Sequence, residues 1–252
     1  MQPLGDRHRS AAGYDRLARV YPWLERLMFG GGLERARQTA ANRLADYLDE
    51  NRSPRIVVLG DGRAGLAKYF VAKLPDAEVT VVDHSVGMLR RSADLGDAIV
   101  RVHGDMRTFD VRGFDVLALP FSMDCLTESE MHDCVDRWRG SLRGDAVVLW
   151  LDFVRGGDGS MVDGRLRRCW SALRLWLMHR FFRVATAHPT TRLVDMPAIF
   201  AGHGFTLVKS TPVKSTPVKS TPVKDSLDDR CLCDAMVRVA IYAVSCSDSA
   251  TI

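Results

Sequence analysis

The sequence lacks long hydrophobic runs, and no apolar stretch approaches the roughly 20 residues that a membrane-spanning helix needs. The first ten residues, MQPLGDRHRS, carry charges and are followed by no apolar segment, so we expect no signal peptide. A strong excess of one charge is also missing, because the net charge is only +4. These absences predict a cytoplasmic protein and give no reason to expect nucleic acid as a partner.

Cysteines are few and scattered, with six in 252 residues. Only Cys231 and Cys233 stand close together, and their spacing matches no common zinc site. Neither an HExxH sequence nor a paired CxxC occurs. We therefore expect neither a disulfide framework nor a bound metal.

From residue 51 onward, apolar runs alternate with helical patterns. Five of the runs are typical of buried parallel strands and recur at intervals of roughly 20–30 residues, as βαβ units do. They are RIVVL at 55–59, EVTVVD at 78–83, AIVRV at 98–102, FDVLAL at 114–119 and AVVLWL at 146–151. Helical patterns fall at 65–74, 86–94, 128–142 and 196–202, and two further strand candidates, FTLV and AMVRVAIYAV, follow. This alternation predicts an α/β fold with a doubly wound sheet.

Before residue 51 the pattern is helical. Apolar residues recur at steps of three and four, at Tyr14, Leu17, Tyr21, Leu24 and Met28. Three glycines at 30–32 end this pattern, and a second helix is expected at 33–48. We expect a helical cap over residues 1–50 and a core over residues 51–252.

A basic, aromatic helical insert is predicted at about 160–184. Its apolar stripe consists of Leu166, Trp170, Leu173, Leu177 and Phe181, and six arginines supply its charge. The pattern favours a lid or core helix with a solvated arginine face. A second interpretation is peripheral contact of residues 165–184 with an anionic membrane, which would bring a lipid-like acceptor within reach.

The pentapeptide VKSTP occurs three times in tandem at 208–222 and is followed by Val223 and Lys224. A proline at every fifth residue excludes a helix and removes donors from a strand. We therefore expect a low-complexity, extended loop at 208–224 between the two final strands. A solvated loop without function is favoured, although its lysines and Thr-Pro steps leave a partner or phosphorylation open.

The segment RIVVLGDGRAGL at 55–66 joins the first buried strand to a helix through a glycine turn. Gly60, Gly62 and Gly65 leave space for a ligand to approach the backbone. Asp83 ends the second strand 21 residues after Gly62, where a carboxylate can accept from both hydroxyls of a ribose. This combination predicts an adenosine-containing cofactor, either a dinucleotide or a methyl donor.

The following residues resemble the class I S-adenosylmethionine-dependent methyltransferases, particularly the group that includes the ubiquinone and menaquinone methyltransferases. That family continues its second strand with a D-x-S-x-x-M-L pattern and its third strand with a Gly-Asp pair. The matching positions here are Asp83, Ser85, Met88, Leu89, Gly104 and Asp105. From the alternation and the resemblance together we expect a three-layer, Rossmann-like fold whose seven-stranded sheet is mostly parallel with an antiparallel last strand.

The resemblance implies S-adenosylmethionine as cofactor and S-adenosylhomocysteine as product. Asp83 would bind the ribose, and Asp105 would accept from the adenine amino group. His84 would lie beside the adenine, and Met106 would pack on its ring. The family's leading helix carries tyrosines that close over the cofactor. The residues expected to bind the cofactor are Tyr14, Tyr21, Gly60, Asp61, Gly62, Gly65, Asp83, His84, Met88, Gly104, Asp105, Met106 and Phe121.

The segment FDVLALPFSMDCL at 114–126 also resembles the family and implies that Pro120, Phe121 and Asp124 lie near the transferred methyl group. Transfer from a sulfonium depends mainly on orientation and exclusion of water, so no catalytic base is compulsory. Asp124, His132 and His188 are candidates by position for an acceptor that must lose a proton. The acceptor expected is a small molecule, either apolar or lipid-like.

The chain departs from the family's pattern in the glycine turn. Val58 stands where the family usually has an acid, the acid appears at Asp61, and Arg63 replaces a small residue. These departures leave open a non-catalytic S-adenosylmethionine-binding module of the same fold. An NAD(P)-dependent oxidoreductase shares the turn and the ribose acid, but the Gly104 and Asp105 pair argues against it. The oligomeric state is left open.

Overall fold

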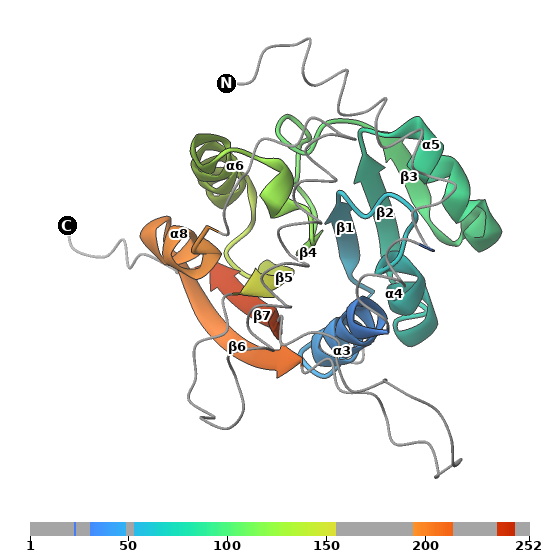
Figure 1. Cartoon of the computed structure of the whole chain (residues 1–252), viewed down its shortest axis with the longest axis horizontal. Helices are drawn as coiled ribbons and strands as arrows, with labels where there is room; N and C mark the ends of the chain where they lie inside the picture. Colours follow the sequence, from blue (N-terminus) through green and yellow to red (C-terminus); the bar gives the residue numbers. More distant parts are fainter. Residues whose placement is uncertain (1–22, 24–30, 49–52, 155–193, 214–235, 245–252) are drawn as a thin grey trace, which may run out of the picture.

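The computed structural model describes residue 23 and residues 31–48, 53–154, 194–213 and 236–244. Seven strands in these residues form one sheet (Figure 1). They are β1 (Arg55–Leu59), β2 (Glu78–Asp83), β3 (Val100–His103), β4 (Val116–Pro120), β5 (Val147–Val154), β6 (Phe205–Val213) and β7 (Met236–Val244). Their order across the sheet is β3-β2-β1-β4-β5-β7-β6.

The first five strands run parallel to one another, whereas β7 is antiparallel to both β5 and β6. Parallel strands covered on both faces need continuous apolar runs, and all five residues of β4 are buried accordingly. The expected seven-stranded, mostly parallel sheet with an antiparallel last strand is confirmed. The chain order reverses between β1 and β4, and ligands of open α/β sheets bind at the carboxyl ends of the strands beside such a reversal.

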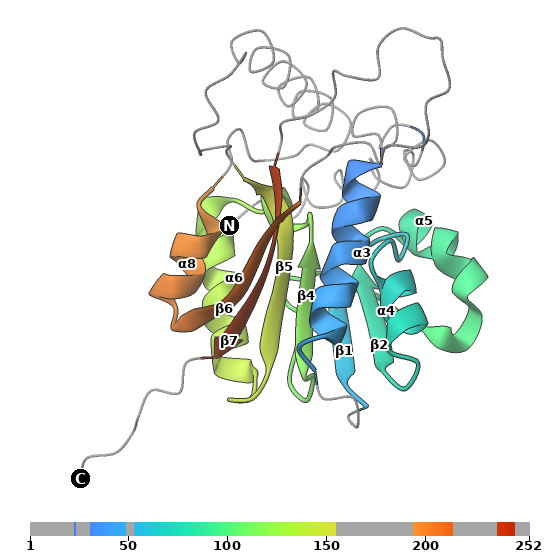
Figure 2. The ribbon, with the colours of Figure 1, turned by 90° about the horizontal axis from the view of Figure 1, so that it is seen from below.

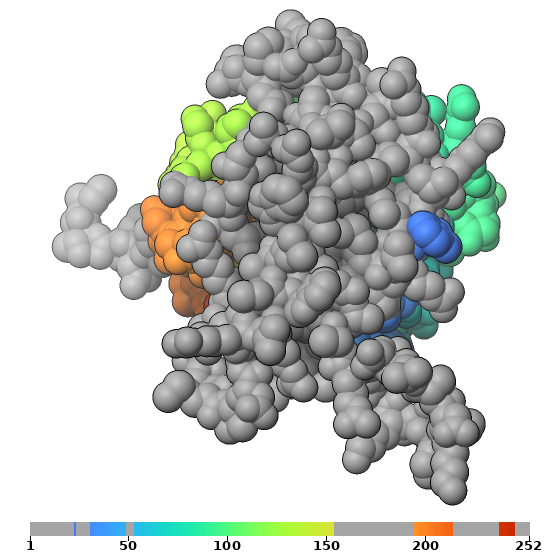
Figure 3. Space-filling view, in the orientation of Figure 1, coloured from blue at the N-terminus to red at the C-terminus, as the bar shows by residue number. Residues whose placement is uncertain are grey.

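Helices cover both faces of the sheet (Figure 2). They are α3 (Gly32–Ala45), α4 (Ala67–Lys73), α5 (Val86–Leu89), η1 (Arg90–Ala98), η2 (Met123–Cys125), α6 (Glu128–Ser141) and α8 (Met196–Gly202). Alternate residues of β1 belong to two separate apolar cores, with Ile56 and Val58 in the core beneath α3 and α4. Val57 and Leu59 belong to the core beneath α6 and α8. Both α6 and α8 reach the molecular surface on one side of Figure 3, and α5 reaches it on the other.

The predicted loop at 208–224 begins too early. The first VKSTP copy and Val213 belong to β6, which pairs with β7 through Val213 opposite Val237. The pairing shifts register between Leu207 and Lys209, as at a β-bulge. Pro212 is tolerated because β6 is an edge strand of this sheet and has β7 as its one neighbour there.

Several predictions lie outside the described residues. They concern Tyr14 and Tyr21, the insert at 160–184 and residues 214–224 of the repeat. The boundaries of the helical cap therefore stay a prediction, although α3 occupies most of the helix expected at 33–48. Within the part of the chain that the structure describes, no helix is long and apolar enough to cross a membrane.

Candidate functional site

A hollow lies at the carboxyl ends of β1, β2 and β3, next to η2. It encloses about 490 Å³, including open solvent at its mouth. Its lining residues are Gly60, Val82, Asp83, His84, Gly104, Asp105, Met106, Arg107, Cys125 and Leu126. The structure thus brings together six of the residues that the sequence predicts for the site, namely Gly60, Asp83, His84, Gly104, Asp105 and Met106.

The glycine turn contains three left-handed residues, Gly60 (φ +77°), Gly62 (φ +47°) and Ala64 (φ +56°). A Cβ on Gly60 would lie 2.6 Å from Cβ of Ser122, so only glycine lets the turn pass the end of β4. The third left-handed position is occupied by alanine, one residue before Gly65. The predicted spacing of three glycines therefore does not coincide with the three special backbone positions.

Asp61 points into the start of the helix that follows the turn. Its carboxylate accepts hydrogen bonds from the backbone N–H groups of Leu66, at 2.9 and 3.0 Å, and Ala67, at 2.9 Å. Burial raises the pKa of Asp61 to about 6, against the opposing charge of Arg37. Asp61 therefore caps α4, and its predicted contact with a cofactor stays a prediction.

The sequence pattern after β2 builds a tight local turn. The carboxylate of Asp83, which is 7% exposed, accepts from the backbone N–H of Ser85 at 2.8 Å. The hydroxyl of Ser85 in turn accepts from the N–H of Met88 at 3.1 Å and caps α5. A Cβ on Gly62 would lie 3.3 Å from Asp83 Oδ2 and 3.1 Å from Met88 Cβ. The residues of the D-x-S-x-x-M pattern thus fix Asp83 against the glycine turn.

His84 follows Asp83 and lines the same hollow. Its Nδ1 lies 3.7 Å from Asp83 Oδ1, and its backbone carbonyl accepts from the ring of His103 at 3.1 Å. Because the bond from His103 crosses from β3 to the residue after β2, it ties together the two loops that carry Asp83 and Asp105.

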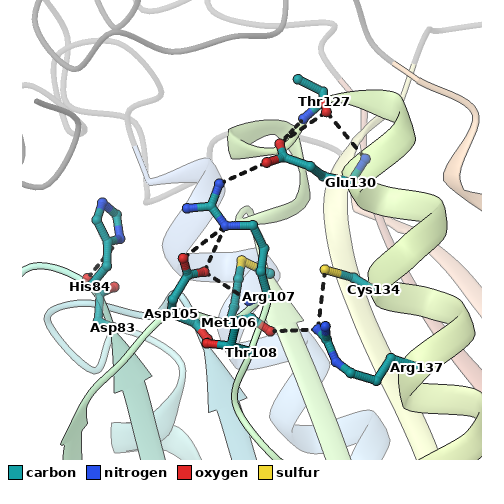
Figure 4. Close-up of polar contacts among 10 residues, drawn as sticks. All are labelled: Asp83, His84, Asp105, Met106, Arg107, Thr108, Thr127, Glu130, Cys134 and Arg137. Atoms are coloured by element: carbon teal, nitrogen blue, oxygen red, sulfur yellow. Dashed lines mark hydrogen bonds and ion pairs between the residues drawn. The ribbon is translucent and has the colours of Figure 1, made fainter. Parts of the chain in front are cut away.

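Asp105 is held by an ion-pair network (Figure 4). Nε of Arg107 donates to both carboxylate oxygens of Asp105, at 2.8 and 3.0 Å, and Nη1 donates to Glu130 at 3.1 Å. Glu130 also accepts from Thr127 and completes the capping box of α6. Burial raises the pKa of Glu130, but the bonds from Thr127 and the charge of Arg107 outweigh it and leave that pKa below its usual range.

Arg107 and Glu130 are missing from the residues predicted for the site. A local signal for each exists in the sequence, namely the Asp-x-Arg spacing at 105–107 and the Thr-x-x-Glu capping pattern at 127–130. The bond between them joins residues 23 positions apart, so it follows from the fold rather than from either pattern.

A second hollow also includes residues of η2. Its lining residues are Met123, Asp124, Met131, Trp150, Asp152, Phe153, Val194 and Met196, and it encloses about 270 Å³, open solvent included. Consecutive residues of η2 divide the two hollows, since Asp124 lines the second and Cys125 the first. Phe121, with φ +52°, precedes this division and packs on Phe153 at a ring-centroid distance of 5.4 Å.

The three candidate bases have different surroundings. Asp124 lines the second hollow. His132 lines neither hollow and pairs with His203 between α6 and α8, with ring nitrogens 2.9 Å apart. His188 lies outside the described residues. Among the residues that the structure does describe, no three His, Cys, Asp or Glu side chains are grouped to hold a metal ion.

No family model matches the sequence, and no curated protein matches it. Solved structures do match. The 1,6-didemethyltoxoflavin-N1-methyltransferase of Burkholderia thailandensis, with bound 1,6-didemethyltoxoflavin and S-adenosylhomocysteine, is 16% identical with a TM-score of 0.61. The match covers 97% of this chain and 93% of that one. The chain has a methyltransferase fold.

Two larger proteins match with similar scores. The mitomycin 7-O-methyltransferase MmcR is 16% identical over 90% of this chain, with a TM-score of 0.57. CalO1, a methyltransferase in calicheamicin biosynthesis solved in its S-adenosylhomocysteine-bound form, is 15% identical over 89% of this chain, with a TM-score of 0.55. The chain spans 60% of the first protein and 56% of the second. The predicted likeness to the ubiquinone and menaquinone group stays a prediction.

Proposed function

We propose that the chain transfers a methyl group from S-adenosylmethionine to a small-molecule acceptor. The observation that carries the proposal is the hollow at the strand-order reversal, where Asp83 and Asp105 extend from neighbouring strand ends. The methyltransferases of the same fold, two of which were solved with S-adenosylhomocysteine, support this choice of cofactor.

The residues of the first hollow fit an adenosine group. Asp83 suits the ribose hydroxyls, since its carboxylate lines the hollow and a carboxylate can accept several hydrogen bonds. Asp105 is fixed by Arg107 and suits the adenine amino group, while Val82, Met106 and Leu126 provide apolar walls for the flat ring. Gly104 suits close approach because a Cβ there would lie 3.3 Å from Val82 Cγ1.

When bound, S-adenosylmethionine supplies an electrophilic methyl group on a sulfonium. The task of the protein is then to orient the acceptor and to exclude water. Residues of η2 line both hollows, so the second hollow adjoins the proposed cofactor site, and we assign the acceptor to it. Two carboxylates line that hollow, Asp124 and Asp152, and we assign the role of proton acceptor to Asp124, which belongs to η2, when the acceptor nucleophile must lose a proton.

The second hollow supports an apolar acceptor that carries a hydrogen-bond donor. Met123, Trp150, Phe153 and Met196 provide apolar walls, while Asp124 provides a carboxylate. A more specific alternative is a lipid-like acceptor that the protein would reach by membrane contact of residues 165–184. Sedimentation with anionic liposomes at two salt concentrations tests it, and failure to bind at either concentration contradicts it.

Titration calorimetry with S-adenosylhomocysteine and with NADH tests the cofactor. We expect heat with the first ligand and none with the second, and we expect Asp83→Asn and Asp105→Asn to weaken binding. Asp94→Asn is the matched control, because Asp94 is exposed on η1. Binding of NADH without S-adenosylhomocysteine would instead support the oxidoreductase. Its proton-relay spacing Tyr-x-x-x-Lys does occur, at Tyr69 and Lys73, but the Tyr69 hydroxyl donates to Glu34 at 2.7 Å and lines neither hollow.

Binding without turnover over a broad panel of acceptors would favour the non-catalytic module. A structure with S-adenosylhomocysteine would then show whether the methyl position opens into the second hollow, as transfer requires.

A further inference from the structure

The proposed cofactor ends in an amino acid whose carboxylate needs hydrogen-bond donors. The usual donors at a glycine turn are the backbone N–H groups that begin the next helix. Here Leu66 and Ala67 donate these groups to Asp61. A second carboxylate at the same place would also be repelled by Asp61 when that group is ionised. The ligand carboxylate therefore needs a cation from another element.

Arg37 comes to the turn from α3. A Cβ built on Gly65 would lie 3.0 Å from Nε of Arg37 and 3.1 Å from its Cζ, so the guanidinium covers the turn where it passes into α4. Its Cζ also lies 5.6 Å from the ring centroid of Phe121, the residue after β4. Figure 2 shows the N-terminal end of α3 on the side of the sheet where the strands end.

The first hollow does not include Arg37, Gly65 or Phe121. Arg37 therefore lies beyond the adenosine end and on the side of Phe121, the residue that the resemblance places near the methyl group. With the nucleoside assigned to Asp83 and Asp105, we assign the carboxylate-bearing part of the cofactor to this side.

Arg37 retains the chemistry for a carboxylate despite its neighbours. Its side chain is 12% exposed, and its Nη1 lies 3.5 Å from Glu34, which also binds Lys68 and the Tyr69 hydroxyl. A guanidinium has five N–H donors and can bind a carboxylate with two of them. The contact with Glu34 involves one of these donors, at Nη1.

We propose that Arg37 binds the carboxylate of the cofactor's amino acid. It would replace the backbone N–H groups of Leu66 and Ala67, which donate to Asp61 instead. This inference rests on the proposed function. It makes Arg37 a binding residue that discriminates S-adenosyl ligands by their carboxylate.

Calorimetry with two ligands tests the assignment. S-Adenosylhomocysteine and its decarboxylated form differ only in the carboxylate, so the ratio of their affinities isolates it. We expect wild-type protein to prefer S-adenosylhomocysteine by about 10- to 100-fold, the range of a charge-assisted pair. We expect Arg37→Gln to remove that preference by weakening only S-adenosylhomocysteine. Arg37→Lys should retain part of it, since lysine keeps the charge but loses the planar fork.

Three control variants separate the pairing from folding effects. Arg43→Gln changes a more exposed arginine in the last turn of α3 and should keep the full preference. Glu34→Gln removes the ion pairs between α3 and α4 but keeps Arg37, so it should also keep the preference. Arg63→Gln tests the other guanidinium of the turn, whose Nε is buried and has no partner among the described residues.

Three results would overturn the inference. They are an equal loss for both ligands in Arg37→Gln, an unchanged preference in that variant, and loss of the preference in Arg63→Gln alone. Binding of neither ligand by the wild-type protein would overturn the proposed function together with this inference.

Discussion

Replacing Asp61 with asparagine should remove a pH dependence of stability. Burial raises the pKa of Asp61 from 3.8 to about 6 in the folded chain. The folded state therefore binds more protons than the unfolded state between these values, and the free energy of unfolding falls as pH rises. A shift of about two units corresponds to about 3 kcal/mol, at 1.36 kcal/mol per unit. The stabilisation is complete below pH 3.8 and is lost as pH rises through 6.

Urea unfolding of both proteins between pH 4 and pH 8, followed by tryptophan fluorescence, measures this difference. We expect the stability of the wild type relative to Asp61→Asn to fall by about 2.5 kcal/mol over that range, because the unfolded carboxyl is already partly ionised at pH 4. Asp46→Asn, an exposed change after α3, should show no such trend. A relative stability that rises with pH would show that the two helix N–H groups outweigh burial, and it would refute the reasoning.

Three further changes test the turn, the ion-pair network and the edge strand. Ala64→Gly should raise the free energy of unfolding in urea by about 0.5–1 kcal/mol, because a left-handed φ of +56° strains alanine but not glycine. A lower free energy of unfolding in this variant would contradict the prediction. Arg107→Gln should lower stability by about 3 kcal/mol in the same assay, since Glu130 is 6% exposed. Arg112→Gln removes an exposed ion pair with Asp110 and should leave the free energy of unfolding nearly unchanged. An equal loss of stability in both variants would refute the argument that burial makes the Arg107 pair important. Deleting one or two VKSTP copies should leave the thermal midpoint nearly unchanged, whereas deleting all three should lower it, since one copy completes β6.

Most of the parallel strands were predictable because an apolar sequence run coincides with a buried position in the sheet. Strands β1, β2, β4 and β5 are mostly buried on both faces, so their apolar runs are continuous, and β1 and β2 begin and end where the runs do. The edge strand β3 is the exception, since none of its residues is buried. The strand β6 was not predictable in the same way. Its period of five and its proline argue against a strand, and an edge position with a register shift satisfies both only once β7 is in place.

In the candidate site, too, the local contacts were predictable from the sequence and the contacts between distant residues were not. Asp83 and Ser85 lie two positions apart and are joined by a hydrogen bond, so their roles can be inferred from the sequence pattern alone. The pair Arg107 and Glu130 and the approach of Arg37 to Gly65 connect separate elements. Such contacts depend on how α3 and α6 pack on the sheet, which a single sequence does not state.

The packing of α3 also accounts for the displaced acid. Val58 is fully buried in the core beneath α3, where Ala36, Ala40 and Ala41 have no exposed surface. A carboxylate at residue 58 would enter this apolar layer at a cost of several kcal/mol unless it were paired there. At residue 61 an acid instead meets two backbone N–H groups, and it thereby occupies donors that a ligand could use. Val58, the capping Asp61 and Arg37 beside the turn are thus consistent with one arrangement, in which β1 and α3 contribute to the same apolar core.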